Sequence, residues 1–81
     1  MLYLIDKPHA KIGLRTARAN PDPTVVLVQD GVVLEPDIDA PIYAVEEDCE
    51  VRGVDLPPAI EPVTYARLVE LIFESEVKTF V

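Results

Sequence analysis

Short apolar segments separated by proline- and glycine-containing turns recur along the whole chain. The clearest, Thr24–Val28, is continuously apolar and rich in β-branched residues. Such strands are typical of parallel sheets that are covered on both faces, whereas a half-exposed strand would alternate apolar and polar residues. The same reasoning predicts a set of short strands at Leu2–Ile5, Thr24–Val28, Ile42–Val45, Ala59–Val63 and Val77–Val81.

Two helices are predicted between these strands. From His9 to Ala19, small and apolar residues recur at helical spacing with basic residues on the other side. From Glu46 to Gly53, acids occupy the first turn, a base lies near the end and a glycine follows, which matches the helix dipole and a glycine C-cap. Between them, Asp30-Gly31 is predicted to form a turn directly after the second strand.

The third predicted helix follows Thr64, which is a suitable N-cap. Its apolar residues sit at the spacing of an amphipathic stripe, and we expect this stripe to pack in the core. Leu71 lies beside the stripe and could extend the apolar surface into a subunit contact. The stripe consists of Tyr65, Leu68, Val69, Ile72 and Phe73.

The alternation of strands and helices predicts an α/β fold with a mainly parallel sheet of four to five strands, in one domain spanning residues 1–81. A domain this small buries only a modest share of its surface, so association with other chains would stabilise it. No apolar run is long enough to span a membrane, and the N-terminal run resembles a strand more than a signal peptide. With a single cysteine no intrachain disulfide can form, and we expect a cytoplasmic protein.

The net charge of −8 argues against direct binding to nucleic acid, which requires clustered lysine and arginine. The distribution is uneven, because Lys7, Lys11, Arg15 and Arg18 give residues 1–19 a local charge of +3 while the remainder is acidic. The simpler interpretation is that these basic residues pair with the chain's own acidic loops. The alternative is a docking face for an acidic partner.

Three segments in order resemble the DsrH/TusB family of small DsrE/DsrF/DsrH-like sulfur-relay proteins. The first is Val26-Leu27-Val28-Gln29-Asp30-Gly31-Val32, and the second runs from Ile42 through Asp48 to Arg52-Gly53-Val54. The third is Thr64-Tyr65 opening an apolar helix that leads to Val77-Lys78-Thr79-Phe80-Val81. Lys7-Pro8 after the first strand also fits, so the resemblance covers nearly the whole chain.

The resemblance implies a small α/β/α sandwich and a role in relaying sulfane sulfur as protein persulfide. In TusBCD-type assemblies the sulfur reaches 2-thiouridine at the tRNA wobble position, and in DsrEFH-type assemblies it serves sulfur oxidation. The implied partners are homologous DsrE/DsrF-like (TusD/TusC-like) subunits, or further copies of the chain as a homo-oligomer. No cofactor or metal is implied, and neither nucleic acid nor a membrane is expected as a direct partner.

Cys49 is the only candidate sulfur carrier. A place in the first turn of a helix favours its thiolate, but the acids Glu46, Glu47, Asp48 and Glu50 around it oppose this. Its spacing to Gly53 also differs from that of the reactive cysteine in the E/D-type subunits. We therefore expect a structural role for this thiol, with persulfide transfer as the alternative.

The remaining candidates lie where parallel strands end, the edge at which α/β proteins place binding groups. Their simpler interpretation is structural, as surface, turn and helix-end residues. A lone histidine is a poor metal site, and the glycines are too far apart for a phosphate-binding loop. The candidate docking residues at this edge are Lys7, His9, Asp30, Gly31, Asp48 and Arg52.

We accordingly expect a structural and docking subunit of a sulfur-relay complex, which is not an enzyme by itself. Two alternatives stay open at this point. In one, Cys49 is a persulfide carrier and the chain acts as a sulfurtransferase. In the other, the chain is a stand-alone homo-oligomeric module with an unrelated binding role.

Overall fold

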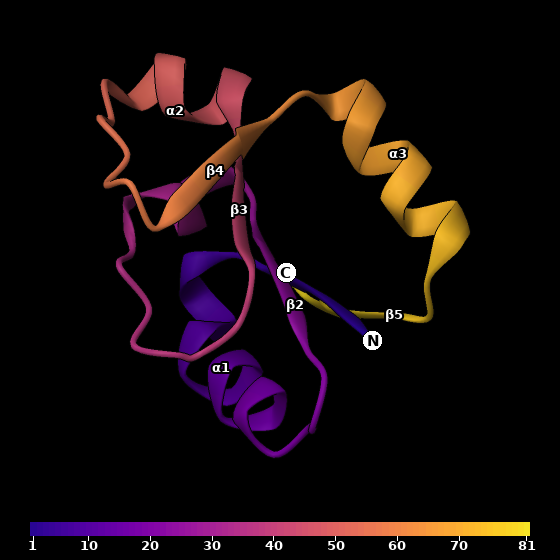
Figure 1. Cartoon of the computed structure of the whole chain (residues 1–81). Coiled ribbons are helices and arrows are strands. Elements are labelled where there is room, and N and C mark those ends of the chain that lie inside the picture. Colours follow the sequence, from indigo (N-terminus) through magenta and orange to yellow (C-terminus); the bar gives the residue numbers. More distant parts are fainter.

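A computed structural model describes all residues from 1 to 81 and contains a single five-stranded sheet (Figure 1). All strand pairs are parallel, and the strand order is β4-β3-β2-β1-β5. The predicted strands are therefore confirmed to within a residue at their ends. Their bounds are β1 Leu2–Ile5, β2 Thr24–Leu27, β3 Ile42–Val45, β4 Ile60–Val63 and β5 Val77–Phe80.

The three predicted helices are also present, as α1 (Ala10–Arg18), α2 (Glu46–Arg52) and α3 (Tyr65–Glu74). Two 3₁₀ helices follow the first two strands, η1 at Lys7–His9 and η2 at Gln29–Val33. The turn expected at Asp30-Gly31 is thus part of a longer 3₁₀ segment. No helix combines the length and the apolar character needed to cross a membrane.

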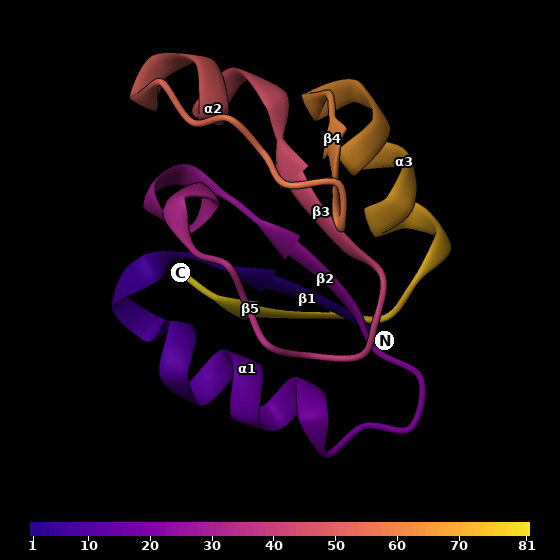
Figure 2. The same ribbon diagram turned by 60° about the vertical axis from the view of Figure 1, so that its left-hand side comes forward.

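The strand order places the helices on both faces of the sheet (Figure 2). Strands β1 to β4 are added in one direction, and the chain then returns through α3 across the whole sheet to β5. Since such crossovers are right-handed, α1, η2 and α2 cover one face and α3 lies on the other. The α/β/α arrangement implied by the resemblance is confirmed.

Side chains of β1 show why the apolar runs are continuous. Tyr3 and Ile5 are buried in a cluster with Ala17 of α1 and Cys49 of α2. Leu2 points the opposite way, as the alternation along a strand requires, and is buried with Leu68 of α3. The central strands have no face turned to water.

Helix α3 differs from expectation, because most of its apolar stripe is not core. Only Leu68 is buried, while Tyr65, Val69 and Phe73 are 41%, 50% and 86% exposed. Leu71 is half-buried against the sheet together with Ile72. It therefore belongs to the contact between α3 and the sheet, and does not extend the apolar surface toward another subunit as expected. The prediction was wrong because a single helix on a sheet buries an arc of about 100°, whereas this apolar arc is wider.

The predicted helix ends are confirmed. The Thr64 hydroxyl accepts a hydrogen bond from the Arg67 amide at 3.1 Å and caps α3. Gly53 ends α2 in the left-handed region with φ of 63°, where a side chain would be strained. The Thr64 cap lies at the carboxyl edge of the sheet, because α3 begins directly after β4, whereas Gly53 lies at the far end of α2.

Candidate functional site

Asp48 is the centre of a polar cluster at the carboxyl edge of the sheet. Its Oδ2 accepts hydrogen bonds from the Gln29 backbone amide at 2.8 Å and from the Tyr65 hydroxyl at 2.9 Å. These partners belong to η2 and to α3, while Asp48 itself stands in the first turn of α2. One carboxylate therefore joins three elements that are far apart in the sequence.

Arg52 completes the cluster from the last turn of α2. Its Nε donates to Asp30 Oδ1 at 2.7 Å, and its Nη1 lies 3.7 Å from Asp48 Oδ1. The hydrogen bond to Asp30 is the main cause that raises the pKa of the Arg52 guanidinium. Through these contacts Arg52 ties Asp30 of η2 to Asp48 of α2.

The hydrogen bond from Tyr65 also changes the ionisation of the tyrosine. It raises the pKa of the Tyr65 hydroxyl, with partial burial and the Asp48 charge adding to the effect. The hydroxyl consequently stays protonated as a donor to Asp48 over a wider pH range than a free tyrosine would.

Gly31 lies beneath this cluster and has a structural role. A Cβ built at this position would lie 2.4 Å from the Ile5 carbonyl oxygen and 3.2 Å from the Asp6 Cα. Only a glycine lets η2 pack this closely on the carboxyl end of β1. The preceding Gln29 adopts a positive φ of 52°, so the chain turns sharply just before Gly31.

Lys7 and His9 occupy the same edge but stand apart from the cluster. Both side chains are exposed on η1 and make no hydrogen bond or ion pair. Their neighbour Asp6 is buried, and its Oδ1 accepts from the Lys7 backbone amide at 2.7 Å. Of the predicted edge residues, the fold thus connects Asp30, Asp48 and Arg52, with Gly31 below them.

Cys49 lies in an environment that suppresses its reactivity. The residue is only 6% exposed and packs among the core residues on the α1–α2 face of the sheet. Burial, followed by the charge of Asp48, raises the pKa of its thiol, and Arg52 only partly opposes this. A shallow hollow of about 430 Å³ beside it is acidic, with Glu46, Glu50 and Asp55 in its wall. The site disfavours both the thiolate and the approach of an anionic donor.

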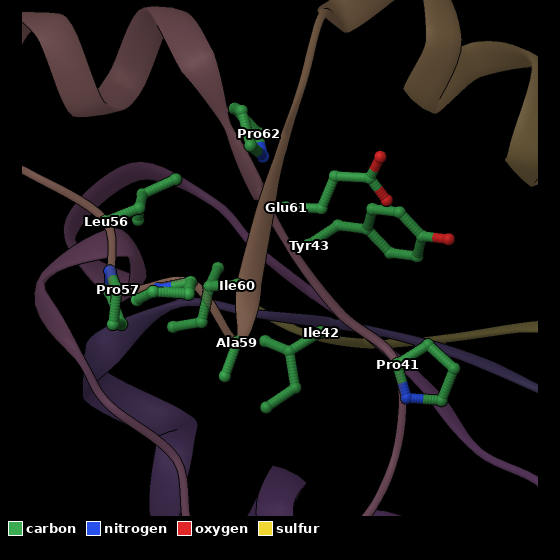
Figure 3. A pocket seen from close by; sticks show the side chains of 10 residues that line it. Pro41, Ile42, Tyr43, Leu56, Pro57, Ala59, Ile60, Glu61 and Pro62 are labelled. Atoms are coloured by element: carbon green, nitrogen blue, oxygen red, sulfur yellow. The ribbon is translucent and has the colours of Figure 1, made fainter.

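A second, open hollow of about 660 Å³ follows strands β3 and β4 (Figure 3). Prolines and aliphatic side chains form most of its wall, and Tyr43 and Glu61 extend side by side from neighbouring strands. No cysteine, serine, threonine, histidine or lysine lines it. No group of three histidine, cysteine or acidic side chains is arranged to hold a metal ion.

The basic N-terminal segment does not pair with the chain's own acids. Lys7, Lys11 and Arg15 are exposed and have no carboxylate within ion-pair distance. The Arg18 guanidinium donates instead to the backbone carbonyl of Asp37, at 2.8 Å from Nη2. The simpler interpretation of this charge was therefore wrong, because α1 faces solvent on its basic side while the acids gather around α2 and α3.

Tyr65 and Gln29 are the members of the cluster that the sequence pattern did not identify. Tyr65 had been assigned to the apolar core stripe. Its place directly after the N-cap was nevertheless informative, because helices of this fold begin at the carboxyl edge of the sheet. Gln29 takes part through its backbone amide. Every residue except proline has such an amide, so the residue type could not predict this hydrogen bond.

The fold and this edge define a small α/β protein with the DsrEFH-like fold. The solved structure of the YchN protein of E. coli has the same architecture. It matches with a TM-score of 0.79 over 98% of this chain and 97% of the other, at 18% sequence identity. No family model matches the sequence, and no curated protein matches it.

Proposed function

We propose that this chain is a non-carrier subunit of an intracellular sulfur-relay assembly, in which homologous subunits bear the persulfide. The observation that carries the proposal is the combination of a DsrEFH-like fold with a buried Cys49 whose pKa is raised. A carrier cysteine needs an accessible thiolate. Cys49 is only 6% exposed, and burial and its acidic neighbours outweigh the charge of Arg52 on its pKa. The sulfur would serve tRNA wobble 2-thiouridine formation or sulfur oxidation.

The chain would contribute a docking surface to such an assembly. The exposed and unpaired Lys7 and Lys11 at the start of the first helical segment are suited to an acidic partner. At the same edge of the sheet, the hydrogen bonds of Asp48 connect η2, α2 and α3. A rigid edge with free cations beside it is what a docking subunit requires.

The direct test is co-expression with DsrE- and DsrF-like subunits, followed by purification and native mass measurement. A mixed oligomer is expected. A Lys7→Glu/Lys11→Glu variant should lose it, whereas Arg67→Glu, a change of the same sign on α3, should retain it. Purification of the chain without either partner would contradict the proposed role and leave the stand-alone module.

The persulfide-carrier alternative has its own test. The folded protein is incubated with a persulfide donor, and the intact mass is compared with that of a Cys49→Ala variant. We expect no added sulfur on the wild-type chain, and we expect sulfur transfer through a reconstituted complex to survive Cys49→Ala. A sulfur adduct on Cys49, together with loss of transfer in the variant, would establish the carrier role instead.

A further inference from the structure

Two charged surfaces of this chain have no partner of opposite charge within the molecule. The basic face consists of Lys7, Lys11 and Arg15, whose side chains are exposed and take no part in any ion pair. The acidic surface covers α2 and the segment that follows it. Its carboxylates are also exposed and unpaired, and they belong to Glu46, Glu47, Glu50 and Asp55. Each surface is therefore free to bind the opposite charge on another molecule.

The acidic surface includes the hollow of about 430 Å³ beside α2. Carboxylates and apolar groups share its wall, with Glu46, Glu50 and Asp55 on the one hand and Cys49, Val54, Leu56 and Pro62 on the other. These carboxylates are not arranged to hold a metal ion. A lysine or arginine side chain fits better, because its aliphatic stem can contact the apolar wall while its cationic end meets the carboxylates. The hollow is thus suited to a basic side chain of another protein.

Helical geometry turns an apolar side chain outward on each charged surface. In α1, Ala17 is fully buried against the sheet, so Ile12 and Arg15 lie on the opposite side of the helix. In α2, Cys49 is buried in the same way, so Val51, two residues further on, points away from the sheet. Ile12 and Val51 are 48% and 81% exposed. An apolar contact surrounded by polar groups is the usual composition of a protein interface, and the two surfaces match in this respect as well.

The two surfaces do not meet within one molecule. Helices α1 and α2 lie apart, with η2 between them (Figure 2). The hollow reaches Pro62 on edge strand β4, whereas α1 packs near Phe80 on β5, at the other edge of the sheet. A second copy supplies what each surface lacks, because its basic face offers three cations to the three carboxylates of the hollow. Contacts between two basic faces or two acidic surfaces would bring like charges together.

The net charge of −8 opposes the approach of two copies, but this repulsion acts mainly at long range. At physiological salt, exposed charges separated by more than about 8 Å are largely screened. The local pairing of cations with carboxylates therefore decides whether the contact forms. Because it joins two different surfaces, the contact can be made twice in a dimer or repeated from one copy to the next.

We propose that the basic face of one copy binds the acidic surface of a second copy, with a lysine or arginine side chain in the hollow beside α2. Ile12 and Val51 supply apolar area within the same contact. The inference deepens the proposed function, because it rests on the basic docking face and names the surface to which that face binds. It requires no sulfur transfer and no second type of subunit.

Charge reversal of each surface tests the proposal on the chain alone. Sedimentation velocity at low salt should show association that increases with concentration and is lost at high salt. Lys11→Glu/Arg15→Glu and Glu50→Lys/Asp55→Lys should each be monomeric, whereas an equal mixture of the two variants should associate. Both variants stay net negative, since two reversals cannot offset the charge of −8. Association of the mixture would therefore reflect the matched surfaces and not attraction between oppositely charged proteins.

The matched control is Arg67→Glu/Lys78→Glu, which makes the same change of net charge away from both surfaces. It should associate like the wild-type chain. A monomeric wild-type chain, a mixture that stays monomeric, or loss of association in the control would each overturn the inference. None of these results would count against the mixed oligomer of the proposed function, which is measured with DsrE- and DsrF-like subunits present.

Cross-linking of the wild-type chain covers the case in which a variant fails to fold. A carbodiimide joins amines to carboxylates that are in contact, and a mixture of isotope-labelled and unlabelled chains identifies the links between copies. We expect links from Lys7 or Lys11 of one copy to the carboxylates of the hollow in another. Links between copies that involve only Lys78, or links confined to single molecules, would overturn the assignment.

Discussion

The Tyr65 hydroxyl donates to the Asp48 carboxylate at 2.9 Å from Oδ2 and 3.0 Å from Oδ1. Through this contact the first residue of α3 is tied to the first turn of α2, across the carboxyl edge of the sheet. Apart from it, α3 is held mainly by Leu68 and its half-buried neighbours on the sheet. The position of an entire helix thus depends on one hydrogen bond and one narrow apolar contact.

Removal of the Tyr65 hydroxyl should loosen α3. Tyr65→Phe is expected to lower the free energy of unfolding by about 0.5–1.5 kcal/mol, the usual net value of a hydrogen bond. Amide hydrogen exchange in the first turn of α3 should become faster. Tyr43→Phe is the matched control, since the Tyr43 hydroxyl makes no hydrogen bond within the chain, and its stability should be unchanged. Equal effects of the two variants would show that the contact does not hold α3.

The core of the α3 face should depend on Leu68 more than on any other residue of the helix. Leu68→Ala is expected to cost about 2–5 kcal/mol, because it removes a buried side chain and leaves a cavity. Val51→Ala on α2, where the side chain is 81% exposed, should change stability by less than about 0.5 kcal/mol. Urea unfolding of the two variants gives the comparison. A small loss for Leu68→Ala would mean that α3 is not docked in solution.

Gly31 should not tolerate any side chain. Gly31→Ala places its Cβ against the backbone of Ile5 and Asp6, which cannot move aside as a flexible side chain could. We expect a loss of about 1–3 kcal/mol or a failure to fold. Gly53→Asn is the control, because a Cβ there meets no atom within 4 Å and asparagine tolerates the left-handed region. Thermal unfolding of both variants checks the contrast, and a stable Gly31→Ala protein would contradict the close packing of η2 on β1.

The reactivity of Cys49 should be low at neutral pH and should depend on its charged neighbours. Alkylation of the folded protein is expected to be much slower than that of the urea-unfolded chain, since burial raises the thiol pKa. Asp48→Asn removes a charge that raises this pKa and should speed alkylation. Arg52→Gln removes a charge that lowers it and should slow the reaction further. The opposite order of rates would contradict this account of the thiol.

The same shift of the Cys49 pKa affects stability at alkaline pH. The folded state keeps the thiol proton to a higher pH than the unfolded state does. The stabilising contribution is therefore complete below the ordinary thiol pKa and is lost as the pH rises through the raised value. In urea unfolding at increasing pH, Cys49→Ala should lose less stability over this range than the wild-type protein. An identical pH dependence would show that the thiol is not responsible.

The sequence by itself determined the local elements and the fold class. Continuous apolar runs such as Thr24–Val28 are typical of strands that are buried on both faces of a covered parallel sheet. Caps such as Thr64 and Gly53 act within a few residues. These signals are local, and they were sufficient to place each strand and helix to within a residue or two. Together with the ordered motifs they also indicated the DsrEFH-like architecture.

Only the tertiary structure decided which residues of these elements meet. Asp48, Tyr65 and the Gln29 amide come from three separate segments, and their contact depends on where three elements end in space. The exposure of Phe73 likewise depends on how α3 rests on the sheet, because an apolar stripe specifies a direction but not the width of the contact. The basic face of α1 and the free edge of β5 follow from strand order, which is set by long-range packing. A local sequence pattern cannot predict contacts between separate elements, because these contacts depend on how all the strands and helices pack together.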